Sequence, residues 1–87
     1  MKKTVLIVFL KTRKDSALRF QKIISKFGCI IKTRLGIHDG VMENCSDTGL
    51  IILELTGEEK HKTALVNKLR ILKDVVVKKV DLALPAR

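Results

Sequence analysis

The chain contains no tryptophan, no tyrosine and only three phenylalanines in 87 residues. Proteins that hold single-stranded nucleic acid commonly stack its bases on aromatic side chains, so this composition excludes such a stacking platform. Two cysteines are too few for a disulfide scaffold, and no apolar run is long enough to cross a bilayer. We therefore expect a cytoplasmic protein that does not enter a membrane.

Acidic residues are also scarce. Nine Asp and Glu stand against 18 Lys and Arg, which gives a formal net charge of +9. An excess of this size points to nucleic acid, acidic lipid or an acidic protein partner. The lysines are scattered along the chain, however, and only Lys11–Lys14 approaches a cluster. A solvated basic surface is the favoured interpretation, and nucleic-acid binding is the minority one.

Residues 1–87 are expected to form one domain, because the chain is short and 46% of it is hydrophobic. Lys2 and Lys3 precede an apolar run, as in a secretory signal. The charged stretch Lys11–Asp15 follows at once without a small-residue cleavage site. We therefore expect the apolar run to be a strand.

Apolar periodicity predicts four strands and two helices. The first and third strands are apolar on both faces, which is typical of strands in the middle of a sheet. The second and fourth carry charges among their apolar residues, which is typical of sheet edges. Both helices repeat apolar residues at helical spacing. The predicted strands are Thr4–Leu10, Cys29–Ile37, Leu50–Leu55 and Val75–Leu82, and the predicted helices are Ala17–Phe27 and Glu58–Leu72.

Local signals predict where the helices begin and end. Gly28 is expected to end the first helix in a left-handed conformation. Thr56 and Glu59 have the spacing of a capping box, in which each side chain accepts a hydrogen bond from the other's free backbone N–H. In the second helix, His61 lies four residues before Leu65 and is expected on the buried side as a packing residue.

The element order β-α-β-β-α-β predicts an α+β, ferredoxin-like sandwich with a four-stranded antiparallel sheet and two helices on one face. The two β-α-β halves suggest an approximate internal duplication. Since the first strand is apolar on both faces, the helix-free face would expose apolar side chains. A large apolar patch is rarely left in water. The chain is therefore expected to self-associate through that face or through an edge strand.

The loop His38–Gly49 holds most of the residue types able to do chemistry. His38 and Cys45 suit a transition metal, but a tetrahedral site needs four ligands, so Asp39, another residue or a second subunit would have to contribute. A metal-free loop is the favoured interpretation. Cys45 as a nucleophile with His38 as its base ranks lower still, because no nucleophile motif surrounds it.

Arg34 and Lys32 are expected to project from one face of the second strand beside this loop. Together with the stretch Lys11–Lys14, they could bind an anionic ligand at a subunit interface. The favoured interpretation is that their charges keep the edge soluble. The candidate ligand residues are Arg34, His38 and Asp39, and the candidate metal ligands are His38 and Cys45.

Several short segments together resemble a known family. They are Arg34-Leu35-Gly36-Ile37, Gly49-Leu50-Ile51-Ile52, Leu65 with Lys68-Leu69, and Val76-Val77-Lys78. The chain is similar in these segments to the iron-only hydrogenase system regulators, small ACT-like domains related in fold to the C-terminal domain of the nickel-responsive repressor. The resemblance implies an ACT-like fold, an oligomer built through sheets, and a regulatory role linked to metalloenzymes.

The expected function is therefore a non-enzymatic sensor or regulatory module that forms a dimer or tetramer and binds a ligand or a partner protein. A metal-binding protein that uses His38 and Cys45 across subunits is one alternative. A basic nucleic-acid-binding ferredoxin-fold domain is another. An enzyme is not expected, because one loop does not supply a base, a nucleophile and an anion-stabilising group together.

Overall fold

The computed structural model describes residues 2–11, 14–38 and 48–85. Each predicted strand and helix is present, with shifted ends. The elements are β1 (Lys2–Lys11), α1 (Lys14–Lys26), the short 3-10 helix η1 (Gly28–Ile30), β2 (Ile31–His38), β3 (Thr48–Leu55), α2 (Glu59–Arg70) and β4 (Val75–Ala83).

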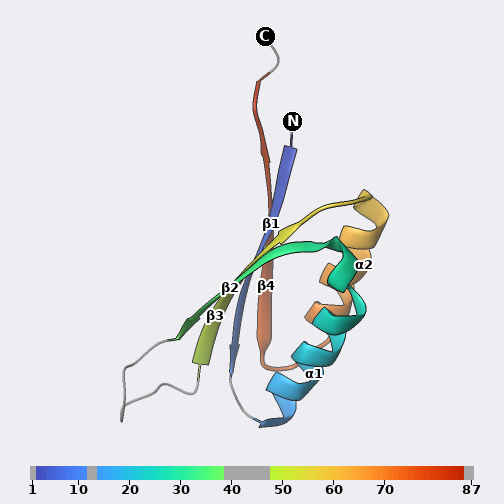
Figure 1. Cartoon of the computed structure of the whole chain (residues 1–87). Helices are drawn as coiled ribbons and strands as arrows, with labels where there is room; N and C mark the ends of the chain where they lie inside the picture. Colours follow the sequence, from blue (N-terminus) through green and yellow to red (C-terminus); the bar gives the residue numbers. More distant parts are fainter. Residues whose placement is uncertain (1, 12–13, 39–47, 86–87) are drawn as a thin grey trace.

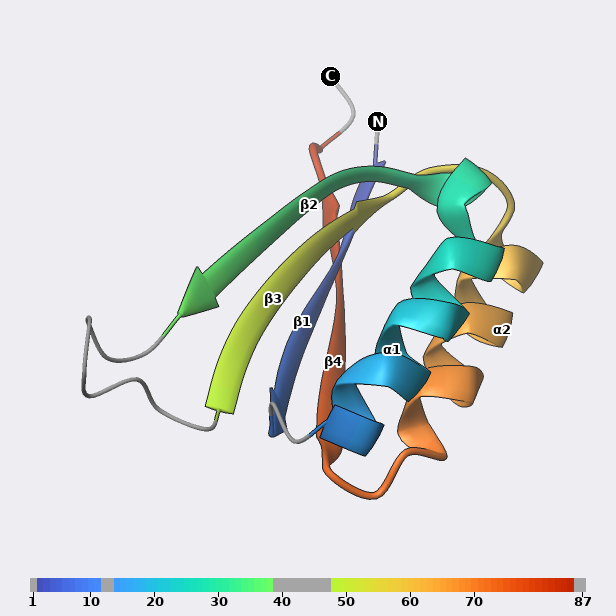
Figure 2. The ribbon, with the colours of Figure 1, turned by 60° about the horizontal axis from the view of Figure 1, so that its bottom comes forward.

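The four strands form one antiparallel sheet in the order β2-β3-β1-β4. Both helices cover the same face of this sheet (Figures 1 and 2). The predicted ferredoxin-like βαββαβ sandwich is therefore confirmed. The central position of β1 and β3 is confirmed as well, which agrees with their apolar composition. The start of β1 and the end of β4 run together past the other strands, with Lys2 paired to Ala83.

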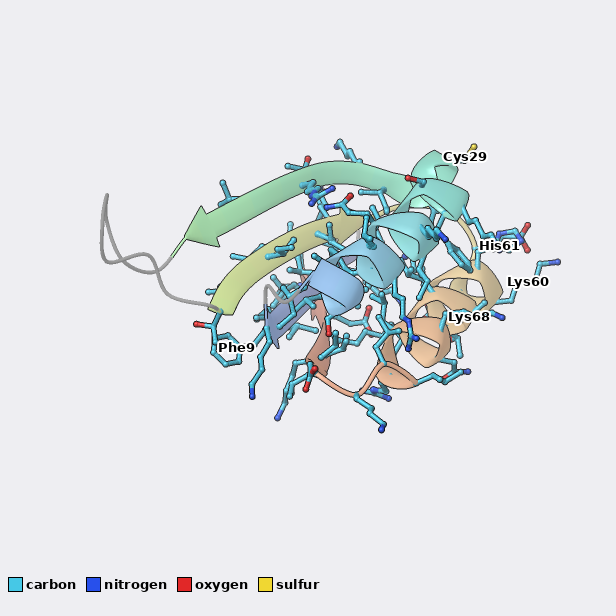
Figure 3. The ribbon with its side chains drawn as sticks, turned by 90° about the horizontal axis from the view of Figure 1, so that it is seen from below. Phe9, Cys29, Lys60, His61 and Lys68 are labelled. Carbon is cyan, nitrogen blue, oxygen red and sulfur yellow. The ribbon has the colours of Figure 1, made fainter. Side chains whose placement is uncertain are left out.

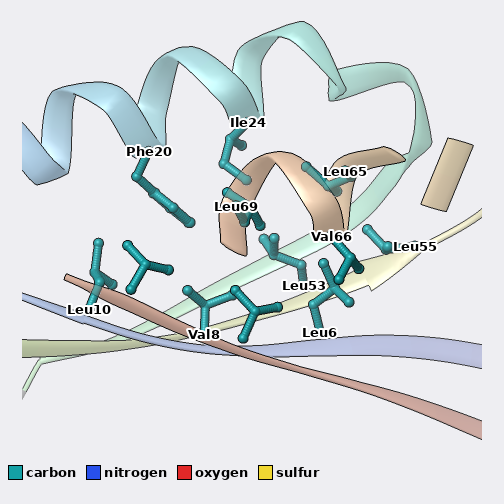
Figure 4. Close-up of a cluster of buried hydrophobic side chains, with 12 residues drawn as sticks. Leu6, Val8, Leu10, Phe20, Ile24, Leu53, Leu55, Leu65, Val66 and Leu69 are labelled. Carbon is teal, nitrogen blue, oxygen red and sulfur yellow. The ribbon is translucent and has the colours of Figure 1, made fainter. Parts of the chain in front are cut away.

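The core lies between the sheet and the helices (Figure 4). Side chains alternate along β1, so that Leu6, Val8 and Leu10 point at the helices and are buried. Phe20 and Ile24 of α1 cover the core from the helix side. Burying each such side chain contributes roughly 1.5–3 kcal/mol. The rest of the buried apolar cluster is Leu53, Leu55, Leu65, Val66, Leu69, Val75 and Val77.

The predicted capping box is wrong. The N-cap of α2 is Glu58, and it makes no side-chain capping hydrogen bond. Thr56 lies two residues before the cap and bonds elsewhere. Its backbone N–H donates to the carbonyl of Ile30 at 2.7 Å, and its hydroxyl contacts the same oxygen at 3.4 Å. Thr56 therefore ties the end of β3 to η1 instead of closing the first turn of α2.

Among the glycines that the structure describes, Gly57 is the one with a positive φ, at 93°, and not Gly28 as predicted. Gly28 begins η1, because the chain tightens into a 3-10 turn after α1 and reaches β2 without a left-handed residue. At Gly57 a side chain would meet Ile30, whose Cγ2 lies 3.3 Å from the position of an added Cβ. Glycine is favoured there by the backbone conformation, and an added side chain would also crowd Ile30.

Candidate functional site

The predicted loop residues fall mostly outside the described part of the chain. His38 is the last residue of β2, where its backbone pairs with Gly49. Asp39 and Cys45 lie outside the described residues. Within residues 2–11, 14–38 and 48–85, no three His, Cys, Asp or Glu side chains gather in a way that could hold a metal ion. The ligand and metal roles of this loop stay predictions.

Arg34 turns toward the helices. Its Nη1 donates to Oε1 of Gln21 at 2.9 Å, and its guanidinium lies 5.9 Å from the ring centroid of Phe20. Lys32 instead approaches Oε2 of Glu54, at 4.0 Å. The prediction that Arg34 and Lys32 share one face is wrong, because the β2–β3 pairing is irregular between Ile31 and Thr33. An extra residue in one strand reverses the face of the side chains beyond it.

The helix-free side of the sheet, which we call the open face, carries apolar side chains that the core does not use. Along β1 it shows Val5, Ile7 and Phe9, the positions between the buried ones. Figure 3 shows Phe9 on the side of the sheet away from the helices. Phe9 is 46% exposed and Ile7 38%. The other apolar members, from the strand register, are Leu35, Leu50, Ile52, Val76, Val80 and Leu82.

These side chains form continuous rows across the sheet. Ile7 pairs with Ile52 on one side, and Ile52 pairs with Leu35. Phe9 pairs with Leu50 and with Val76. Neighbours in such rows stand about 5 Å apart, close enough to form one surface. The expectation that the open face exposes apolar side chains is therefore met in all four strands.

One end of the open face is charged. Nζ of Lys3 donates to Oε2 of Glu54 at 2.9 Å, and the hydroxyl of Thr33 lies 3.4 Å from Oε1. Because the ammonium of Lys3 donates this hydrogen bond, the pKa of Glu54 is held below its ordinary value. The same bond raises the pKa of Lys3. Glu54 is thus an ion-paired carboxylate with two lysines beside it.

A shallow concavity of about 380 Å³ lies beside this ion pair on the open face. Its floor is apolar and its charged groups are Lys3 and Glu54, which stand together on one side. It is lined by Lys3, Val5, Thr33, Leu35, Ile52, Glu54 and Leu82. A partner that covers the open face would also enclose this concavity.

A second polar cluster lies on the helix side of the sheet and was missed from the sequence. Lys62 is only 7% exposed, whereas His61 is exposed, so the prediction of a buried His61 is wrong. Nζ of Lys62 donates to Oγ1 of Thr4 at 3.0 Å. The Thr4 hydroxyl in turn donates to Oδ1 of Asp81 at 2.7 Å, which holds the pKa of Asp81 below its ordinary value.

This cluster continues to the surface. Lys79 donates a hydrogen bond to Glu59, which lowers the pKa of Glu59 and raises that of Lys79. Nζ of Lys2 lies 3.3 Å from Oε2 of Glu59. The cluster joins α2 to β1 and β4. Thr4 and Asp81 face each other in two adjacent strands, a pairing that only the strand register reveals.

The outer side of the helix layer is basic. Five of its exposed cations make no ion pair with any residue that the structure describes, and they are Arg19, Lys22, Lys26, Lys68 and Arg70. Figure 3 shows Lys60 and Lys68 projecting from α2. The carboxylates of Glu58 and Glu59, near the start of α2, are already paired with lysines.

No helix in the described ranges is long and apolar enough to cross a membrane. No family model matches the chain, and no curated protein matches its sequence. Solved structures do match. An uncharacterized protein of Thermotoga maritima, TM1266, superimposes with a TM-score of 0.81 at 25% identity, over 95% of this chain and 100% of that one.

Two more distant structures share the architecture. The ACT domain of a GTP pyrophosphokinase from Chlorobium tepidum matches with a TM-score of 0.67 at 18% identity, over 90% of this chain and 96% of that one. A structure of CPII from Thiomonas intermedia K12, bound to ADP, AMP and acetate, matches with a TM-score of 0.59 at 13% identity, over 98% of this chain and 90% of that one. The chain therefore has the α+β ferredoxin-like fold that ACT and PII-like domains share.

Proposed function

We propose that this chain is a non-enzymatic regulatory or sensor module of ACT-like type, which works as a cytoplasmic homo-oligomer. The observation that carries the proposal is the open face, an apolar sheet surface on a fold shared with ACT and PII-like domains. A domain with such a surface needs a partner to cover it. Ligand binding between subunits can then shift the population of assembled states.

The fold neighbours support a sensing role. One is an ACT domain within a GTP pyrophosphokinase, and another is CPII, solved with ADP, AMP and acetate. By analogy, we propose that this chain binds a small metabolite near the His38–Gly49 loop or at a subunit interface. Arg34, His38 and Asp39 are the proposed ligand residues. A transition metal held by His38 and Cys45 of different subunits is the alternative ligand.

The finer part of the proposal concerns what is regulated. The resemblance to the iron-only hydrogenase system regulators supports a link to the assembly or expression of such metalloenzymes. The two long helices in the described part of the chain, α1 and α2, both pack on the sheet as part of the core. We therefore propose that any effect on transcription passes through a partner protein.

A thermal-shift screen of metals and small metabolites tests the sensor proposal, because a ligand selective for the folded state raises its apparent stability. We expect at least one metabolite to raise the melting temperature in a saturable way. Arg34→Met should abolish that rise, whereas Arg19→Met, which removes a cation on the outer side of α1, should not. If no metabolite or metal shifts the melting temperature, the sensor proposal fails.

Binding of a polyanion is the second candidate function. The unpaired cations on the outer side of α1 favour it, since phosphate groups are recognised mainly by Lys and Arg. Gel shifts on duplex DNA and RNA at several salt concentrations test it. Binding that weakens steeply with salt and is lost in Lys22→Glu would support this candidate. The absence of binding at low salt would reject it.

A further inference from the structure

We infer that the open face is covered by the same face of a second copy, so that two sheets pack against each other with the helix layers outside. This rests on the homo-oligomer in the proposed function and says which surface forms it. It also chooses between two arrangements that the sequence left open: packing through the open face and pairing through an edge strand.

The open face is large enough to form a dimer interface. Four strands spaced about 4.8 Å apart span roughly 19 Å, and eight residues along β1 span roughly 27 Å. Two such faces in contact bury on the order of 1,000 Å² in total, which is the lower bound for a specific interface. The apolar side chains that take part come from all four strands. The face is therefore a credible dimer interface by area.

The chemistry of the face also fits an interface. Ile7 and Ile52 are paired in its centre, between Phe9 on one side and Val5 on the other. Charged groups lie around them, as in interfaces with an apolar middle and a polar rim. Among the described residues of the four strands, the carboxylate on this face is Glu54, which Lys3 already neutralises at 2.9 Å, so covering it leaves no unpaired anion there. These properties favour an apolar partner surface.

Lys78 is the cation least suited to burial on this face. It lies on β4, an edge strand, opposite Ile7 in the register. Its long apolar stem can lie along the partner while its ammonium reaches water past the edge. Lys78 therefore does not prevent a second copy from covering the face.

The two edges of the sheet are less suited to pairing. β2 carries the irregularity beside Lys32, which interrupts the regular ladder that an added strand needs. β4 has Lys78 and Lys79 in its middle and Pro85 just beyond its end. Lysines and irregular pairing are features that protect edge strands from further pairing. Face packing is thus favoured over a continuous sheet.

A second copy fits this surface better than an unrelated partner. Two sheets of the same right-handed twist pack face to face at about 30° with interdigitating side chains. The contact is closed, because each copy uses the same face once. Arg19, Lys22 and Lys26 then lie on both outer sides of the pair, where like charges oppose the stacking of more copies. The geometry points to a dimer.

Sedimentation equilibrium of the full chain tests this inference. We expect a particle of twice the chain mass of 9.8 kDa at micromolar concentration. Ile52→Asp should raise the dimer dissociation constant about 100-fold or more, because each dimer then buries two unpaired carboxylates. Ile7→Asp should raise it by a smaller factor, since Lys78 lies opposite position 7 and can pair with the new carboxylate. The matched controls are Leu18→Asp and Ile71→Asp. They change exposed apolar residues away from the open face and should leave the dimer intact.

Circular dichroism shows whether each variant is folded. If Ile7→Asp does not fold, Leu35→Lys replaces it, because Leu35 is 52% exposed on an edge strand. The dimer should also persist in molar salt, where an assembly held together by bound nucleic acid would dissociate. A wild-type monomer would overturn the inference. So would a dimer that survives both face substitutions, or one that dissociates with Leu18→Asp. A ligand-induced thermal shift in a monomer would leave the sensor proposal standing.

Discussion

The ammonium of Lys62 on α2 donates a hydrogen bond to the hydroxyl of Thr4 on β1, with 3.0 Å between Nζ and Oγ1. Thr4 is fully buried, and Lys62 is nearly so. A cation in such a place is stable only if it is hydrogen-bonded and its charge is balanced. Here the Thr4 hydroxyl connects Lys62 to the carboxylate of Asp81. The start of α2 is thereby fixed to the middle and the edge of the sheet.

The first prediction concerns this pair. Thr4→Val should lower the free energy of unfolding by about 1–3 kcal/mol, because it leaves the Lys62 ammonium buried without its acceptor. Thr4→Val combined with Lys62→Met should be less destabilised than the sum of the two single changes, since both partners are then apolar. Urea unfolding at fixed protein concentration measures this. Strictly additive effects would show that the two side chains are not coupled.

The second prediction separates the core from the exposed surface. Leu53→Ala should lower the free energy of unfolding by about 2–5 kcal/mol, because Leu53 is fully buried in the centre of the sheet. Leu18→Ala, which truncates a residue 54% exposed on α1, should change it by roughly 0.5 kcal/mol or less. Both are read from urea unfolding. Equal effects would mean that the core does not lie where the structure places it.

The third prediction concerns the thermal stability of the fold at low pH. The pKa values of Glu54, Glu59 and Asp81 are lowered in the folded chain by hydrogen bonds from Lys3, Lys79 and Thr4 respectively. A carboxyl group with a lowered folded pKa contributes stability above its unfolded pKa and loses it as the pH falls through the folded value. The melting temperature should therefore fall once the pH drops below the ordinary values of 4.5 for Glu and 3.8 for Asp.

The matched variant for this prediction is Asp81→Asn. It removes one of the three titrating groups, so its melting temperature should be lower near pH 7 and should depend less on pH between about pH 5 and pH 2. Thermal melts across this range provide the measurement. A wild-type curve that stays flat to pH 2 would contradict the assigned hydrogen bonds.

The fourth prediction compares two glycines. Gly57→Ala should lower the free energy of unfolding by about 1–2 kcal/mol, because its φ of 93° is unfavourable for a residue with a side chain. Contact with Ile30 adds to this effect. Gly28→Ala meets no atom within 4 Å and should be neutral or slightly stabilising. Denaturant unfolding distinguishes them, and a larger loss at Gly28 would count against this account.

The order of strands could be predicted because it depends on composition summed over whole strands. β1 and β3 are apolar on both faces, which is typical of strands in the middle of a sheet. Local details depended instead on single contacts. The Thr56 backbone N–H donates its hydrogen bond to the carbonyl of Ile30. The irregular pairing beside Lys32 places the side chain of Arg34 on the other face of the sheet. Neither contact leaves a periodic signal in the sequence.

The candidate site, too, could be predicted from the sequence only in part. The open face followed from the alternation in β1, which predicted apolar residues opposite the core. The burial of Lys62 could not be predicted from the sequence, because its place on α2 requires a hydroxyl from β1, 58 residues away in sequence. A single lysine on an amphipathic helix is ordinarily exposed. The roles of His38, Asp39 and Cys45 stay predictions from the sequence.

The pairing of Lys2 with Ala83 brings the first and last strands out of the molecule at the same end. Figure 1 shows this end opposite the one where β2 stops and β3 starts. Reporter proteins joined next to Lys2 and next to Ala83 would therefore lie side by side, on the same end of the sheet and away from His38. Energy transfer between two such reporters, one on each copy, would reveal whether the copies lie head to head or head to tail.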